Sequence, residues 1–447
     1  MRGCTIDFFL RPGFAHSLQC TPLDLGTDGR YTSVWHGSAL RDIKCPIDPT
    51  QPFFRDDVYH PVSGLREIRC PVQYNVDWFK VADGSSSGGI YVANLSLPIE
   101  QRHARENRLP IGLMPGPSEP SNDQFNHYLL PFVNEMYDSY ANGWEMTAAG
   151  RNGVDDEQVV VRVALVMVSA DQPALRKCAG CIGHMATTGC YKCDARTRGC
   201  GYQGAGELGT PCDPTTWHEN ALRWMRAESE KKRKEEMAEH RTRWSAFLLL
   251  PTFDPTSALT VDVMHNVLLG MTRRTLKVWM DADILKPAQL KAMETIYRTV
   301  MTFPSDLGRF PSTFSAGFSG FSAHEMLQFM LYFSNLLFPR VGVPAVHVDG
   351  WMRLVKFTRI VLNESFTEEE LNFAQGHLQK GPKSIYTINA HLALHIVDVL
   401  RQWGPVHNTW CFAFERYNGE LGNISSNNRS FEIVFMRSLL RQRVLTQ

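Results

Sequence analysis

The sequence lacks an excess of charge of either sign, and it lacks a long apolar run. Its 447 residues carry 46 Lys and Arg against 46 Asp and Glu, so the formal net charge is zero. A surface that binds nucleic acid must therefore be a local basic patch, because no global positive field attracts phosphate. The longest apolar runs, such as that at 159–168, fall well short of the roughly 20 residues that span a bilayer. We therefore expect no membrane segment and no membrane partner.

The N-terminal residues also lack the apolar stretch of a secretory signal, and we expect a reducing compartment. Eleven cysteines, an odd number, then argue for free thiols and for metal ligands. The chain has no visible internal repeat. At about 150 residues per domain its length predicts roughly two or three domains, and its 43% hydrophobic and 21% charged residues are typical of a globular protein.

The first half of the chain has the patterns of a sheet. Two β-rich runs around a Gly/Ser turn predict a hairpin at 72–98, and a Pro-bounded run predicts a short strand at 109–117. Residues 125–143 have helical spacing with a glycine stop. The β-branched run at 158–171 is typical of a strand that is buried on both faces, and it is the best candidate for a central strand.

The remaining segments differ from this part in their hydrophobic and charge patterns. Residues 1–65 show no lasting periodicity, and we interpret them as an irregular lead-in. Residues 260–375 show mostly amphipathic helical patterns. The helical pattern at 220–244 carries eight Lys and Arg against five Glu, which indicates either a solvated helix face or an arm that contacts phosphate.

Four cysteines follow the spacing C-x2-C-x8-C-x2-C. Thiolate pairs at this spacing can each supply two corners of a tetrahedral zinc site. Cys190 and Cys193 follow a glycine as a zinc knuckle does, and we interpret them as zinc ligands, whereas Cys178 and Cys181 lie in a helical pattern and are interpreted as core residues. The sequence leaves the other ligands open among His184, His218, His240, Cys200 and Cys212.

Three further histidines are less decisive. His391 and His395 share one helix face at i, i+4, which is the spacing of zinc hydrolases, but no glutamate base lies between them. We interpret both, and His265 in "VDVMHN", as core or second-shell residues.

Three carboxylates occupy positions that the local sequence pattern makes unusual. Asp77 interrupts a strand-like run, where β-propensity disfavours it. Asp171 ends the buried strand, which fits either an α/β active site or an N-cap for the next helix. Glu415 emerges from an aromatic run on a helix, and its alternative role is a salt bridge to Arg416.

Taken in order, several blocks of the sequence resemble a known family. They include "NVDWF", "ENRLPIGLMPGPSEP", "DQPALRKCAGCIGHMATTGCYKC", "LTVDVMHNVLLG" and "HLALHIVDVLRQWGPVHNTWCFAFERYNGELG". These blocks, spread over about residues 70–440, resemble the transposases of the CACTA (En/Spm) superfamily, in particular the fungal branch related to the Kyakuja-Dileera-Zisupton elements. The resemblance implies an α/β fold with a ribonuclease H-like mixed sheet that is flanked by helices. A large, mostly helical insertion with a zinc knuckle interrupts this fold.

The resemblance also implies a division of the chain. The lead-in at 1–65 precedes the first part of the catalytic core at 66–185. The zinc knuckle and helical insertion occupy 186–380, and the rest of the core follows at 381–447.

The family's metal-binding triad maps onto Asp77, Asp171 and Glu415, with Mg²⁺ or Mn²⁺ as the catalytic metal and Zn²⁺ in a structural role. Asp83 competes with Asp77, and Glu432 competes with Glu415. If the assignment is correct, the carboxylates of Asp77 and Asp171 must lie on one face at one end of the sheet. We expect the three to converge on an acidic pocket that is open to solvent and flanked by basic side chains.

The implied function is cut-and-paste DNA transposition, with metal-dependent cleavage and strand transfer at the element ends. Its partners would be DNA, both terminal inverted repeats and target DNA, and a second copy of the chain when active, in the nucleus. The alternative is a domesticated or truncated relative that keeps the fold as an inactive DNA-binding or scaffold protein.

Overall fold

A mixed five-stranded sheet forms the centre of the computed structural model, which describes residues 1–80, 86–152, 154–196, 207–301, 313–379, 387–424 and 431–445. The strand order is β3-β2-β1-β5-β4. The pairs β1–β2, β2–β3 and β4–β5 are antiparallel, and β1–β5 is parallel. The strands are β1 (Arg66–Lys80), β2 (Ser86–Asn94), β3 (Leu109–Met114), β4 (Trp144–Ala148) and β5 (Glu157–Val168). The predicted α/β class with a mixed sheet is therefore confirmed.

The β-branched run becomes β5, and it is buried from Val159 to Val168. Such a strand needs cover on both faces, which suits its place beside the central strand β1. The predicted hairpin is β1–β2, but it does not lie at the edge of the sheet, because β3 and β4 take the two edges. The sequence analysis missed β4, whose five residues follow directly after a helix.

The two faces of β1 and β2 pack against different helices. Tyr74 and Val76 belong to a large core with α4 (Asn122–Asn142), which packs on β5. Because side chains alternate along a strand, Asp77 and Phe79 face the other way. Phe79 belongs to a second core with α17 (Phe412–Gly422) and α18 (Phe431–Leu445). The C-terminal helices thus cover the face to which Asp77 points.

The N-terminal segment is mostly irregular, as expected, but it packs into the main core of the chain. It contains α1 (Arg2–Phe9) and α2 (Ala39–Asp42), and α1 packs on β4. Its scattered aromatic side chains, such as Trp35 and Phe53, are buried in the main core. Single aromatic residues bury a large area without any periodicity, which is why the sequence pattern did not reveal them.

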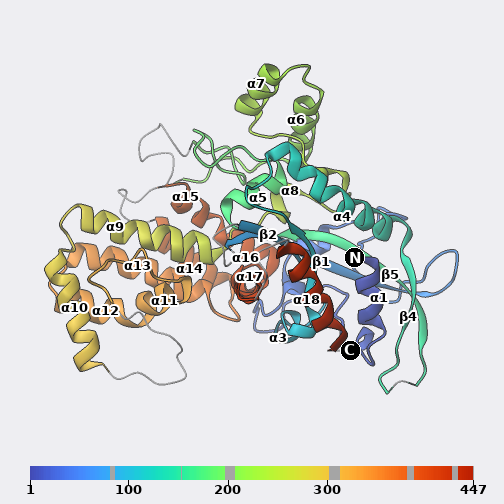
Figure 1. Cartoon of the computed structure of the whole chain (residues 1–447), viewed down its shortest axis with the longest axis horizontal. Helices are drawn as coiled ribbons and strands as arrows, with labels where there is room; N and C mark the ends of the chain where they lie inside the picture. The colour runs from blue at the N-terminus through green and yellow to red at the C-terminus, as the bar shows by residue number, and fades with distance from the viewer. Residues whose placement is uncertain are drawn as a thin grey trace.

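Most remaining elements are helical, as expected for 260–375. Helices α6 and α7 stand away from the sheet, at the top of the view in Figure 1. Helices α9 to α14 gather in a lobe at the left of the same view. No described helix is long and apolar enough to cross a membrane. The other helices are α3 (Ile99–Arg102), α5 (Gln172–Ala179), α6 (Pro214–Arg226), α7 (Glu230–His240), α8 (Pro255–Ala258), the π-helix η6 (Met264–Thr272), α9 (Arg273–Asp281), α10 (Pro287–Val300), α11 (Ala323–Gln328), the π-helix η8 (Phe329–Phe333), α12 (Ser334–Arg340), α13 (Ala345–Val361), α14 (Glu368–Gln379), α15 (Ile388–Leu394) and α16 (Ile396–Trp403).

Candidate functional site

The parallel register of β1 and β5 brings Asp77 and Asp171 to the same end of the sheet. Tyr74 pairs with Val168, and each aspartate lies three residues beyond its member of this pair. The Ser169 amide still donates to the Tyr74 carbonyl at 3.0 Å, so the two chains remain side by side as they leave the ladder. Asp77, within β1, and Asp171, three residues after the end of β5, therefore lie at the same end of this strand pair.

Glu415 reaches this end of the sheet from α17, which packs on β1. The carboxyl groups of Asp77 and Glu415 are hydrogen-bonded to each other. Three residues further along α17, the Asn418 amide donates to Asp77 Oδ2 at 2.8 Å. Residues 415 and 418 lie on one helix face at this spacing, so a single helix both contacts and orients the Asp77 side chain.

The contact sets the two pKa values apart. Burial, followed by the negative charges of Glu415 and Asp171, raises the pKa of Asp77 to about 8. Burial alone would raise the pKa of Glu415 as well, but the hydrogen bond and positive charge of His265 lower it below its ordinary value. The surroundings therefore favour the protonated form of Asp77 and the ionised form of Glu415.

Asp171 is the N-cap of α5, as the alternative interpretation predicted. Its Oδ1 accepts from the Ala174 amide at 2.8 Å. Burial raises the pKa of Asp171 above its ordinary value although this hydrogen bond acts in the opposite direction. Asp171 influences Asp77 through its charge, but Asp77, Asp171 and Glu415 are not among the groups whose ligand atoms all lie within 4.8 Å of one another.

A buried aspartate that the sequence analysis missed holds the base of this site. Asp262 Oδ2 pairs with His265 Nδ1 at 2.7 Å, and Asp262 Oδ1 accepts from the Cys411 amide at 3.0 Å. His265 Nε2 lies 3.4 Å from Glu415 Oε1. Asp262 thus fixes both the imidazole and the residue that precedes α17. The D-x2-H spacing on a helix start was the available signal, since a carboxylate at this position can cap and orient a following histidine.

Burial opposes a charge on His265, but its hydrogen bonds with Asp262, Cys411 and Glu415 raise its pKa well above the ordinary value. The imidazolium is therefore the cation of a site that otherwise gathers carboxylates. His265 thus contacts and supports the candidate ligand Glu415, which is one of the two roles that the sequence analysis left open for it.

The structure gives no support to Glu432 or Asp83, the alternatives to Glu415 and Asp77. Glu432 accepts from the Ser87 hydroxyl at 2.7 Å and is not part of the contact between Asp77 and Glu415. Asp83 lies outside the described residues. The contact of Glu415 with His265, rather than with Arg416, also separates the two interpretations of Glu415.

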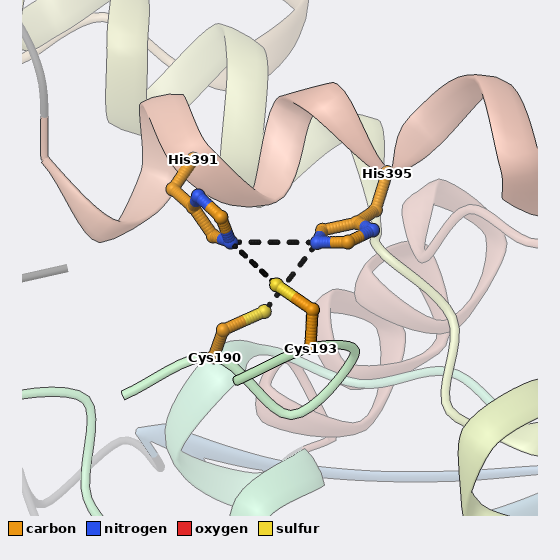
Figure 2. Close-up of side chains that lie close together, drawn as sticks. All are labelled: Cys190, Cys193, His391 and His395. Atoms are coloured by element: carbon orange, nitrogen blue, oxygen red, sulfur yellow. Dashed lines mark hydrogen bonds between the residues drawn. The ribbon is translucent and has the colours of Figure 1, made fainter. Parts of the chain in front are cut away.

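A second cluster joins Cys190 and Cys193 to His391 and His395 (Figure 2). All four side chains are buried, and their ligand atoms all lie within 4.8 Å of one another. Cys193 Sγ lies 3.2 Å from His391 Nε2, and Cys190 Sγ lies 3.5 Å from His395 Nε2. The two Nε2 atoms are 3.4 Å apart. Figure 2 shows both rings pointing from one helical stretch toward the two sulfurs.

These distances are the edges of a small tetrahedron. Zinc bonds of about 2.0 Å to nitrogen and 2.3 Å to sulfur correspond to edges of roughly 3.3 to 3.8 Å. The observed spacings of 3.2 to 3.5 Å fall close to this range. Hydrogen bonds from Cys190 and the two imidazoles also lower the pKa of Cys193, and the thiolate is the form that binds metal. The four residues could therefore hold a metal ion.

The two histidines correct the sequence analysis, which placed them in the core without a ligand role. The expected partners His184, His218, His240 and Cys212 are not in the cluster, and Cys200 lies outside the described residues. The i, i+4 spacing of His391 and His395 was the signal, but their distance in sequence from Cys190 concealed the connection. Cys178 and Cys181 are buried and stand apart from the cluster, as expected for core residues.

Comparison of the chain with protein-family models and with curated proteins finds no match. The geometry of the two clusters therefore carries the functional argument.

Proposed function

We propose that this chain is a DDE-type DNA transposase with a ribonuclease H-like core, in which Asp77, Asp171 and Glu415 are the catalytic carboxylates. The observation that carries this proposal is the meeting of Asp77 and Glu415, from distant parts of the chain, next to Asp171. Carboxylates that lie close together in a buried place repel one another and lower the stability of the fold, and a purely structural role gives no reason to maintain them. A functional site does give one.

Hard carboxylate oxygens suit Mg²⁺ or Mn²⁺. When bound, such ions would activate a water or 3′-hydroxyl and stabilise the leaving oxygen of an in-line attack on phosphate. The chain's own residues prepare the ligands: Asn418 orients Asp77, and the His265 imidazolium holds the Glu415 carboxylate ionised. Asp171 keeps one oxygen on the α5 amide, which leaves its other oxygen for a ligand role.

We further propose that the Cys190, Cys193, His391 and His395 cluster holds structural Zn²⁺. Its ligands come from both sides of the predicted boundary between the insertion at 186–380 and the C-terminal part of the core at 381–447. A zinc ion there would fasten the zinc knuckle to the segment that leads to α17 and Glu415. The metal would act on the reaction only through this support.

The proposed substrate is DNA, both the terminal inverted repeats and the target, and the active form would be a homo-oligomer in the nucleus. The second candidate function is an inactive, transposase-derived DNA-binding or scaffold protein. The observation in its favour is that Asp171 already serves as a helix cap and the three carboxylates do not form one close group.

A strand-transfer assay with terminal-repeat DNA and Mg²⁺ or Mn²⁺ tests the proposal. We expect Asp77→Asn, Asp171→Asn and Glu415→Gln each to reduce strand transfer by at least about a thousandfold, since each removes a metal ligand. Glu432→Gln, a carboxylate outside the contact, is the matched control and should retain activity. Activity that survives Asp171→Asn would sink the triad, and an inactive wild-type chain that still binds DNA would favour the second candidate.

A further inference from the structure

A basic groove runs along the same helical stretch that carries His265. The π-helix η6 begins beside the carboxylates and continues into α9, where Arg273, Arg274 and Lys277 line a groove of about 780 Å³. At an α-helical rise of about 1.5 Å per residue, which exceeds that of a π-helix, these cations lie at most roughly 12 to 18 Å along the helix from His265. This is about four or five nucleotides of one strand at 3.4 Å each.

The groove is preorganised by its close-packed walls. Gly270 lies against Asn389, and a Cβ at Gly270 would come within 2.3 Å of the Asn389 amide nitrogen. Arg273 donates to the carbonyl of Phe321, which anchors the loop that forms the opposite wall.

The groove has the donors that a phosphate backbone requires. Arg274 is exposed, and Lys277 is 60% exposed and pairs only with the equally exposed Asp281. Exposed pairs of this kind are weak and can exchange for phosphate. The lining also offers hydroxyl and amide groups, from Ser315, Ser319 and Asn389. Among the described residues that line the groove, Asp281 is the one carboxylate.

The other basic region, on α6 and α7, is less suited to this role. Lys232 pairs with Glu235 and Glu236, and Arg233 pairs with Glu230. Arg241 and Arg243 are used internally, as donors to backbone carbonyls. Arg241 and Arg243 are therefore unavailable to phosphate, whereas the exposed pairs of Lys232 and Arg233 can exchange as that of Lys277 can. The arm is also disfavoured by its position, because α6 and α7 stand away from the sheet that carries Asp77 (Figure 1).

We propose that the groove lined by Arg273, Arg274 and Lys277 binds the phosphates of a DNA strand that leads to the carboxylate site. This inference rests on the proposed function for the direction of the strand. The binding itself depends on the groove's charge and requires no catalytic metal.

Fluorescence anisotropy with a labelled 30-base-pair duplex, in buffer without Mg²⁺ or Mn²⁺, tests the groove in the full chain. We expect the double variant Arg274→Gln, Lys277→Gln to weaken binding about tenfold or more near 0.1 M salt. The slope of log affinity against log salt should become shallower by about 1 to 2. Arg273 is left in place because it anchors the Phe321 loop. An unchanged thermal unfolding curve would show that the variant is folded.

The matched control is Lys231→Gln, Lys234→Gln, which removes the same charge from the exposed face of α7. It should change the affinity by less than about twofold. Equal losses in both double variants, a loss in the α7 variant alone, or a wild-type chain that does not bind the duplex would each overturn the groove assignment. Strand transfer that survives Asp171→Asn, together with intact groove-dependent binding, would overturn the proposed function and leave the groove standing.

Discussion

The two ends of the β1–β5 strand pair treat buried charge in opposite ways. At the end where the strands begin, Glu67 lies between Arg69 and Arg162, which are register partners. At the other end, the carboxyl groups of Asp77 and Glu415 are in contact, and the charge of Asp171 acts on Asp77. The first cluster compensates one anion with two cations, whereas the second gathers carboxylates around a single imidazolium.

The charged groups of the first cluster are buried and hydrogen-bonded to one another and to backbone carbonyls. Glu67 accepts from Arg69 at 2.6 Å and from Arg162 at 3.1 Å, and the three side chains are at most 1% exposed. The remaining donors of the two arginines go to the carbonyls of Phe53 and Tyr140, each at 2.6 Å. Such a network has no capacity left for a ligand. The second cluster gathers more carboxylates than cations, which is what the proposed metal site would need.

The cysteine and histidine cluster should give the largest effect, because its anions are compensated only when a metal is bound. His391→Ala should remove about one equivalent of zinc and forfeit a large part of a binding free energy on the order of 10 kcal/mol. Elemental analysis of the purified protein and thermal unfolding measure the two effects. Cys212→Ser, which changes a nearby thiol outside the cluster, should retain the zinc. Zinc that follows Cys212 instead of His391 would contradict the ligand set.

Breaking the compensated end should have the next largest effect. Glu67→Gln leaves two buried guanidinium groups without their anion, and removing one partner of a buried ion pair typically costs about 3 to 5 kcal/mol. Urea unfolding should therefore show a much lower midpoint, or the variant should fail to accumulate in soluble form. A midpoint that matches the wild type would mean that the charges are not held as the structure describes.

The sequence predicted most of the sheet-forming runs and marked Asp77, Asp171 and Glu415 as candidates, because these inferences depend on local signals. The run that forms β5 is β-branched throughout, and Asp77 stands out as a charge inside a strand. The sequence could not supply the parallel register that brings Asp77 level with Asp171, since register depends on contacts between distant segments.

The same limit explains the missed ligands. His391 and His395 show a visible i, i+4 spacing, but their ligand role depends on Cys190 and Cys193, which are remote in sequence. Asp262 was missed because its partners, His265 apart, come from another helix.

Replacing Asp77 by a neutral asparagine should stabilise the fold, whereas Glu67→Gln should destabilise it. Asp77→Asn keeps a donor for Glu415 and removes an ionisation that the folded state opposes. Because the folded-state pKa of Asp77, about 8, exceeds the unfolded value, the bound proton stabilises the wild type at low pH. This stability is lost as the pH rises from about 4 to about 8.

As the pH rises through this window, we therefore expect the free energy of unfolding of Asp77→Asn to increase by about 2 kcal/mol relative to that of the wild type. The raised pKa of Asp77 alone would give a larger difference, but the lowered pKa of Glu415 offsets part of it. Denaturant unfolding at several pH values, without added Mg²⁺, measures the difference. A wild type whose advantage over the variant grows with pH would contradict the protonated form assigned to Asp77.

The smallest effect should come from an ion pair one residue away from the compensated cluster. Arg66 and Glu157 are in contact at 2.6 Å at the start of β1 and β5, but their side chains are 36% and 43% exposed. Water screens such a pair, so Glu157→Gln should cost less than about 1 kcal/mol in urea unfolding. The substitution is the same as Glu67→Gln in chemistry and lies on the neighbouring strand, so burial is the principal difference between them. If Glu157→Gln costs as much as Glu67→Gln, compensation of buried charge is not what distinguishes this end of the sheet, and the contrast with the carboxylate end loses its physical basis.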